Sequence, residues 1–170
     1  PRRGINSASH KGIWGSAAAS AKALGLDNQQ TLNAFGLAGF MASGISEYAE
    51  GAHSMMKRLM GGWPSHNGVM ASLLARKGLT GPPTMLEDKW GYCWTFAGDE
   101  EPRIEELTKD LGRSFQILER EVKPYAAWGG SHLCIDAVNI LKVQYQIQPQ
   151  DVEEVVILCA KRLYENSQIR

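Results

Sequence analysis

Apolar residues recur at helical spacing through the first half of the chain. The stretch from Gly12 to Leu24 is rich in alanine, glycine and serine. Alanine has the highest helix propensity, and small side chains allow helix axes to approach closely. This stretch therefore predicts a helix that is buried between other helices. Gly25 suits the end of that helix, and Asp27 suits the cap of the next one.

Two further helices are predicted in this half. From about Asn28 to Ser43, large apolar residues form a broad surface in which Gly36 and Gly39 are embedded. A glycine inside a helix costs roughly 1 kcal/mol relative to alanine, so both glycines favour close packing against a neighbour. Residues 64–77 carry the next set of apolar residues at helical spacing.

Other parts of this half are less regular. Residues 1–11 are predicted to be a polar loop, and 44–63 an irregular segment. From Leu86 to Phe96 the aromatic residues lie two apart, which fits a helix or a strand, and we predict a helix. Residues 104–111 predict a short amphipathic helix.

The character of the sequence changes after residue 112. Residues 114–125 show no clear helical period, whereas Ser131 begins a stretch with apolar residues at helical spacing. Val152 to Leu158 is rich in β-branched residues and predicts a strand. The sequence thus predicts a mainly α protein, with an all-helical region followed by the start of an α+β region. The boundary is expected between residues 112 and 126.

A cationic segment precedes the helix at residues 64–77. Lys57 and Arg58 are followed by Gly61 and Gly62, and Pro64 suits the first turn of a helix. A basic loop before a helix N-terminus favours an anion, so a carboxylate or phosphate ligand is one interpretation. The other is a glycine turn with solvated basic side chains.

Composition limits the classes of partner. The chain has 18 basic and 18 acidic residues, so no net charge points to nucleic acid or a membrane surface. Cys93, Cys134 and Cys159 show no metal-ligand spacing, and we expect reduced, buried thiols in the cytoplasm or a similar compartment such as the mitochondrial matrix. No run is long enough to span a bilayer. The chain begins without methionine, and we expect it to be part of a longer protein.

Several stretches together resemble the MmgE/PrpD family of 2-methylcitrate dehydratases and cis-aconitate decarboxylases. They follow one another in the family's order over nearly the whole chain. These stretches are Gly12-Ile13-Trp14-Gly15, Ala23-Leu24-Gly25-Leu26, Leu37-Ala38-Gly39, Lys57-Arg58-Leu59, the 68–78 helix with Leu79-Thr80-Gly81-Pro82, and Tyr125 through Gly130-Ser131-His132 to Ile135-Asp136-Ala137.

The resemblance implies a fold and a class of chemistry. It implies part of a large helical domain over 1–124 and the start of a smaller α+β lid domain over 125–170, in an enzyme that is usually a homodimer. It also implies activity on small di- and tricarboxylates with no metal or organic cofactor. Dehydration, decarboxylation and epimerisation of such substrates all build negative charge on carbon beside a carboxylate. A suitable site therefore needs cations and a positioned acid or base.

Site residues follow from the same resemblance. Lys57 falls on the family's active-site lysine, which would bind a carboxylate and stabilise charge, and Arg58 beside it is expected to bind substrate. His132 falls on the histidine that begins the lid domain, where it would donate or accept a proton. Tyr125 is expected to line the pocket from the same hinge. Asp136, one helical turn after His132, either orients that histidine or makes a local cap.

The chain also departs from the family. Asn6 stands where the family commonly has a pocket histidine, Ala8 where it has threonine, and Met60 where it has a histidine. Asn6 would hydrogen-bond a substrate carboxylate or merely shape its turn, and His10 would compensate if the loop is rearranged. We expect the full-length protein to be a 2-methylcitrate dehydratase-like lyase and this part alone to be inactive. The changes leave open an epimerase, a cis-aconitate decarboxylase-like enzyme, or a non-catalytic homologue or fragment that serves as an oligomerisation module.

Two other histidines are present in the chain. His53 is a loop histidine near the expected site, and His66 is expected to be structural.

Overall fold

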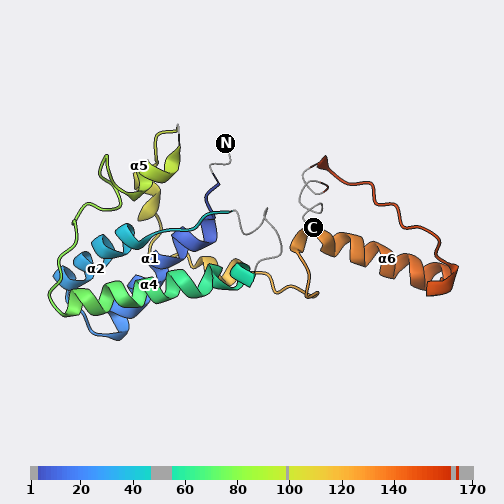
Figure 1. Ribbon diagram of the computed structural model, residues 1–170, viewed down its shortest axis with the longest axis horizontal. Helices are drawn as coiled ribbons and strands as arrows, with labels where there is room; N and C mark the ends of the chain where they lie inside the picture. The colour runs from blue at the N-terminus through green and yellow to red at the C-terminus, as the bar shows by residue number, and fades with distance from the viewer. Residues whose placement is uncertain (1–3, 47–54, 99, 162–163, 165–170) are drawn as a thin grey trace. The chain divides into compact units, whose positions relative to one another are not determined.

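The computed structural model describes residues 4–46, 55–98, 100–161 and 164. The chain divides into two compact units, Pro1–Lys109 and Asp110–Arg170. Within the described ranges the structure is mainly helical, as predicted (Figure 1). The α-helices are α1 (Ser7–Ala23), α2 (Asn28–Met41), α4 (Leu59–Arg76), α5 (Tyr92–Ala97) and α6 (His132–Tyr145). The short 3-10 helices are η1 (Met55–Arg58), η2 (Ile104–Leu107), η3 (Gln116–Glu119), η4 (Gly129–Ser131) and η5 (Pro149–Asp151).

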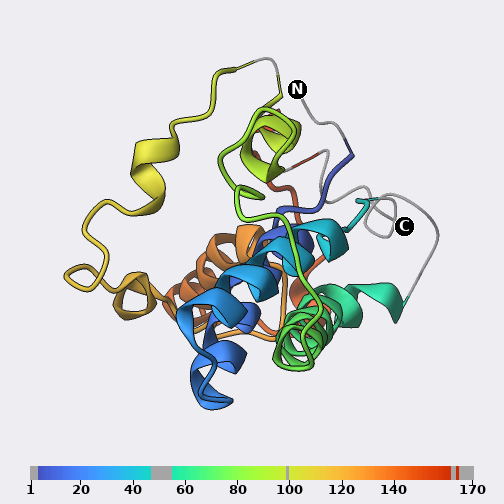
Figure 2. The ribbon, with the colours of Figure 1, turned by 90° about the vertical axis from the view of Figure 1, so that its left-hand side faces the viewer.

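Three helices form the core of the first unit. Figures 1 and 2 both show α1, α2 and α4 lying side by side. The fully buried residues between them are small, with Ile13 of α1 the largest and Ala17, Ala38 and Ala71 around it. The prediction that the alanine-rich helix is buried between others is confirmed, because small side chains are what allow α1 to contact both neighbours.

Embedded glycines mark the closest contacts, as predicted for α2. A Cβ atom at Gly36 would lie 2.6 Å from the backbone oxygen of Pro82, and one at Gly68 of α4 would lie 2.5 Å from the Cβ of Ser16. Both distances are far below van der Waals contact, so alanine cannot occupy either position without a shift of the backbone. The segment after α4 therefore packs directly onto the backbone of α2.

The predicted boundary between α1 and α2 is also confirmed. Gly25 has a φ of 66°, the left-handed conformation that glycine adopts without strain at a helix end. The Asp27 side chain accepts a hydrogen bond from the backbone N–H of Gln30, and the Gln30 side chain accepts one from the Asp27 N–H. This capping box satisfies two backbone donors at the start of α2.

Two helix starts were predicted wrongly. Helix α1 begins at Ser7, within the predicted polar loop, because Asn6 caps it. Helix α4 begins at Leu59, so Gly61 and Gly62 are helical rather than a turn, and Pro64 lies inside the helix rather than in its first turn. Packing offsets the cost of these residues, since Pro64 is buried and lies against Gly12 of α1.

Three later elements also differ from the prediction. Helix α5 begins only at Tyr92, after a series of turns, and the helix expected over residues 104–111 ends at Leu107 as the single turn η2. The strand expected from Val152 to Leu158 is wrong, because this segment is irregular and pairs with no other described backbone. A strand needs a hydrogen-bonding partner, and β-branched composition does not supply one.

The described part of the second unit consists of α6, the short 3-10 helices η3, η4 and η5, and irregular segments. Helix α6 begins after Ser131, as predicted, but none of its residues is buried. The cysteines are free thiols, as expected, yet their predicted burial is wrong. Cys93 and Cys134 are half-buried, and Cys159 is exposed in the segment that follows the unpaired residues 152–158.

Candidate functional site

The N-terminus of α1 holds two predicted site residues, Asn6 and His10. The Oδ1 atom of Asn6 accepts hydrogen bonds from the backbone N–H and the hydroxyl of Ser9, both at 2.9 Å. The backbone N–H of Asn6 donates to the carbonyl of Gly44 at 3.0 Å, which joins the start of α1 to the segment after α2. The structure thus gives Asn6 the role of helix cap, and its amide oxygen is occupied within the helix end.

His10 is buried, with 5% of its surface exposed, one turn into α1. Its Nδ1 atom shares a 2.5 Å hydrogen bond with the hydroxyl of Tyr92 from α5, and its ring stacks on Phe96 at 4.6 Å between centroids. Burial, assisted by the charge of Lys11, lowers the pKa of His10, so the ring is neutral at neutral pH. The structure therefore places His10 in an aromatic cluster between α1 and α5.

The same cluster includes Trp14 and continues to α2. The Trp14 ring meets Tyr92 edge-on at 4.9 Å and stacks on Phe35 of α2 at 5.9 Å. Burial raises the pKa of Tyr92 to about 12, so its hydroxyl stays protonated. The indole N–H of Trp14 is buried and has no hydrogen-bond acceptor among the described residues. Tyr92, which sequence analysis missed as a partner of His10, lies 82 residues further along the chain.

Helices α1 and α4 run in the same direction, so the cationic segment before α4 lies at the end of the first unit where α1 begins. Gly12 lies against Pro64, the Ser16 hydroxyl donates to the carbonyl of Ser65 at 2.7 Å, and the Ser72 hydroxyl donates to that of Ala17 at 3.2 Å. Residues further along α1 thus contact residues further along α4, so the two helices are parallel.

Two predicted site residues, Lys57 and Arg58, form the last turn of η1 directly before α4, and both are exposed. Because α1 and α4 are parallel, this turn and the capped start of α1 lie at one end of the helical unit. The positive end of both helix dipoles faces that end, where an anion is favoured. The structure thus places Asn6 and His10 at the start of α1 and Lys57 and Arg58 directly before α4.

The second unit holds the other two predicted site residues, Tyr125 and His132. The Tyr125 hydroxyl donates a 2.5 Å hydrogen bond to Oδ1 of Asp136, and its ring meets His132 edge-on at 5.4 Å. This hydrogen bond is the main reason that the pKa of Tyr125 is raised. The Nε2 atom of His132 lies 3.3 Å from the carbonyl oxygen of Ala127. His132, Tyr125 and Asp136 therefore form one cluster at the start of α6.

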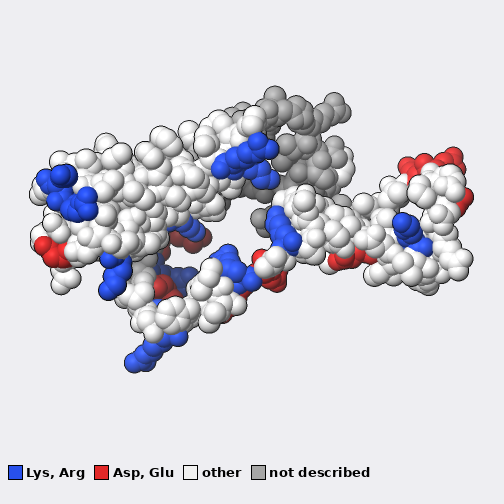
Figure 3. Space-filling model, turned by 90° about the horizontal axis from the view of Figure 1, so that it is seen from below, with Lys and Arg blue, Asp and Glu red and all other residues white. Residues whose placement is uncertain are grey.

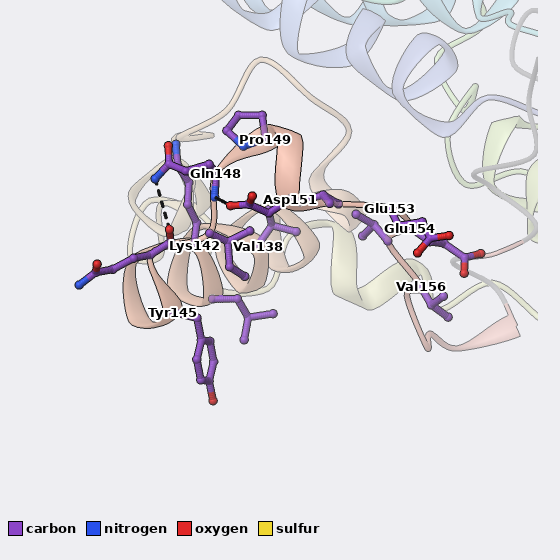
Figure 4. Close-up of a pocket in the computed structure, with 14 residues that line it drawn as sticks. Val138, Lys142, Tyr145, Gln148, Pro149, Asp151, Glu153, Glu154 and Val156 are labelled. Carbon is purple, nitrogen blue, oxygen red and sulfur yellow. Dashed lines mark hydrogen bonds between the residues drawn. The ribbon is translucent and has the colours of Figure 1, made fainter.

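A cavity of about 890 Å³ lies elsewhere in the second unit, at the far end of α6. Val138, Lys142 and Tyr145 of the helix line this space together with residues of the segment that follows (Figure 4). None of the six predicted site residues lines it. The cavity is thus separate from the His132 cluster.

The remaining histidines are His66 and His53. His66 stacks on Trp63 at 5.7 Å, and its Nδ1 atom lies 3.1 Å from Oδ1 of Asn67. His53 lies outside the described residues. No group of three His, Cys, Asp or Glu side chains suited to a metal occurs in the described part of the chain.

Surface charge and helix length add two observations. Figure 3 shows basic and acidic side chains interspersed over the visible face, with no single large patch of either sign. None of the described helices is both long enough and apolar enough to cross a membrane.

Comparison with known proteins gives the family. The model of the MmgE/PrpD N-terminal domain matches residues 1–105. The cis-aconitate decarboxylase-like protein oryM of Aspergillus oryzae is 33% identical over 148 residues, which cover 84% of this chain and 30% of that protein. A cis-aconitate decarboxylase of Aspergillus terreus is 29% identical over 150 residues, covering 83% and 30%. The chain thus spans about 30% of the length of these relatives. With more than half of its residues matched by the family model, the chain belongs to the MmgE/PrpD family.

Proposed function

We propose that the full-length protein is a carboxy-lyase that removes carbon dioxide from cis-aconitate or a closely similar tricarboxylate. The observation that carries this proposal is the similarity to cis-aconitate decarboxylases over more than four fifths of the chain. The exposed cations Lys57 and Arg58, at the end of the unit where two helices begin, support a polycarboxylate ligand.

The reaction has two requirements that these residues can meet. Breaking the bond from carbon to the departing carboxylate leaves an electron pair on that carbon, and a proton must then be added there. Lys57 and Arg58 bind the remaining carboxylates and stabilise the developing negative charge. The resemblance to the family assigns the role of proton donor to His132. The proposed mechanism uses no metal or organic cofactor, and we expect the enzyme to be a homodimer.

One observation favours a second candidate, a non-catalytic homologue that serves as an oligomerisation module. The amide oxygen of Asn6 is engaged in capping α1, at a position where the resemblance leads us to expect a pocket histidine. A site without that histidine has one proton donor fewer.

Dehydration of 2-methylcitrate and epimerisation, which need different proton transfers, are distinguished from decarboxylation by the products of the reaction.

Calorimetry on the full-length protein tests the proposal. Wild type and Lys57→Met are titrated with cis-aconitate, citrate, 2-methylcitrate and succinate, and Lys77→Met is the matched control because Lys77 is exposed at the opposite end of α4. We expect cis-aconitate binding to weaken at least tenfold in Lys57→Met, since a charged hydrogen bond contributes about 1.5–3 kcal/mol. The control is expected to bind as wild type does. Absence of binding to the whole panel would favour the non-catalytic homologue.

A further inference from the structure

His132 is held in a defined orientation by groups on two sides. A carbonyl oxygen can only accept hydrogen bonds, so the 3.3 Å contact between Nε2 of His132 and the Ala127 oxygen requires the proton on Nε2. The same oxygen also accepts from Nζ of Lys123 at 3.2 Å, which fixes the carbonyl in place. A neutral His132 with its proton on Nε2 has an unprotonated Nδ1.

Asp136 is the group best placed to reverse that tautomer. It lies four residues after His132 on α6, and side chains with this spacing are neighbours on one face of a helix. A carboxylate that accepted a hydrogen bond from Nδ1–H would place the proton on Nδ1 instead.

Tyr125 orients the Asp136 carboxylate, which makes no hydrogen bond to His132 among the described residues. Its hydroxyl donates to Oδ1 of Asp136 at 2.5 Å, while its ring meets the imidazole of His132 edge-on at 5.4 Å with 84° between the planes. The side chain thus contacts both members of the pair. In the described part of the chain, Nδ1 of His132 makes no hydrogen bond, so this nitrogen is left for another proton partner.

We propose that Nδ1 of His132 is the atom that exchanges a proton with substrate, and that Tyr125 is a positioning residue that keeps the proton of the neutral ring on Nε2 by holding Asp136 in an orientation in which it makes no hydrogen bond to Nδ1. The assignment of Nδ1 to proton exchange rests on the proposed function. The assignment of the tautomer rests on the geometry alone. In the proton-donating step, Nδ1 of His132 first takes up a proton from solvent, then gives it to carbon, and the ring returns to the Nε2–H form.

Nitrogen NMR of the histidine side chains in the full-length protein tests the tautomer without any substrate. Wild type is expected to show the Nε2–H form of His132. Tyr125→Phe keeps the ring but frees Asp136, so we expect the ratio of Nε2–H to Nδ1–H to fall about fivefold, the effect of one typical hydrogen bond. The double variant Tyr125→Phe with Asp136→Leu is expected to restore the wild-type ratio, because no acceptor then remains for Nδ1–H.

The matched control is Tyr145→Phe, which removes the hydroxyl of an exposed tyrosine at the other end of α6 and is expected to leave the ratio unchanged. A wild-type protein in the Nδ1–H form would overturn the proposal, as would a Tyr125→Phe variant with an unchanged ratio. Failure of the proposed function is a separate result, in which the Nε2–H tautomer is present but cis-aconitate is left unchanged by the same protein.

Discussion

Substituting alanine for Gly36 is expected to lower the free energy of unfolding by about 2 kcal/mol. A Cβ atom there would lie 2.6 Å from the oxygen and 2.7 Å from the nitrogen of Pro82, and 2.7 Å from the carbonyl carbon of Gly81. All three are backbone atoms, so a side-chain rotation cannot relieve the contacts. Overpacking of this kind costs up to about 3 kcal/mol. The higher helix propensity of alanine offsets about 1 kcal/mol of this cost.

Gly61 provides a matched control within another helix. It lies in the first turn of α4, and a Cβ atom added there meets nothing within 4 Å. The same substitution at Gly61 should therefore raise the free energy of unfolding, by at most about 1 kcal/mol. The two variants are thus expected to differ by about 3 kcal/mol, and the changes are expected to have opposite signs.

Urea unfolding of the full-length protein, followed by circular dichroism, measures both variants against wild type. A Gly36→Ala variant at least as stable as wild type would refute the close approach of residues 81–82 to α2. A Gly61→Ala variant that loses stability as Gly36→Ala does would show that α4 does not extend to this position.

Three further outcomes are expected. Asn6→Ala should cost about 1 kcal/mol in urea unfolding through loss of the α1 cap, whereas Asn6→Asp, which keeps the acceptor, should cost much less. Ser72→Ala removes the buried hydrogen bond from α4 to α1 and should cost about 1 kcal/mol, while Ser65→Ala, at an exposed position, should cost less. The lowered pKa of His10 means that folding disfavours its protonated form, so stability should be full above pH 6.5 and fall as the pH drops below it. Thermal melts from pH 5 to 8 should show a smaller acid loss in His10→Gln, and an equal loss would contradict the burial of this ring.

Local chemistry predicted the elements that local contacts determine. Gly25 and Asp27 end one helix and begin the next through their own backbone and side-chain atoms, so their residue types were sufficient. Gly36 was recognised because a helix tolerates an embedded glycine mainly where a neighbour needs the space. Asparagine is a preferred N-cap residue, so the start of α1 after Asn6 is also determined by local contacts.

Elements that depend on distant residues could not be predicted in the same way. The Gly61-Gly62 pair lies in the first turn of a helix that packs on α1 further along, and the local sequence does not reveal that packing. Val152 to Leu158 has the composition of a strand, yet pairing requires a second segment that the described residues do not provide.

The candidate site shows the same limit. His10 meets Tyr92 across 82 residues, and no spacing rule connects them. Tyr125 and Asp136 are 11 residues apart. The sequence predicted that Asp136 orients His132 or makes a local cap, and the structure instead shows its hydrogen bond to the tyrosine.

Decarboxylation by the full-length protein is tested most directly by proton NMR of the protein mixed with cis-aconitate in heavy water. We expect the six-carbon tricarboxylate to become a five-carbon dicarboxylate with one carbon-bound deuterium, and Lys57→Met to abolish this conversion. Unchanged cis-aconitate with no deuterium uptake, in a sample shown to be folded by circular dichroism, would contradict it.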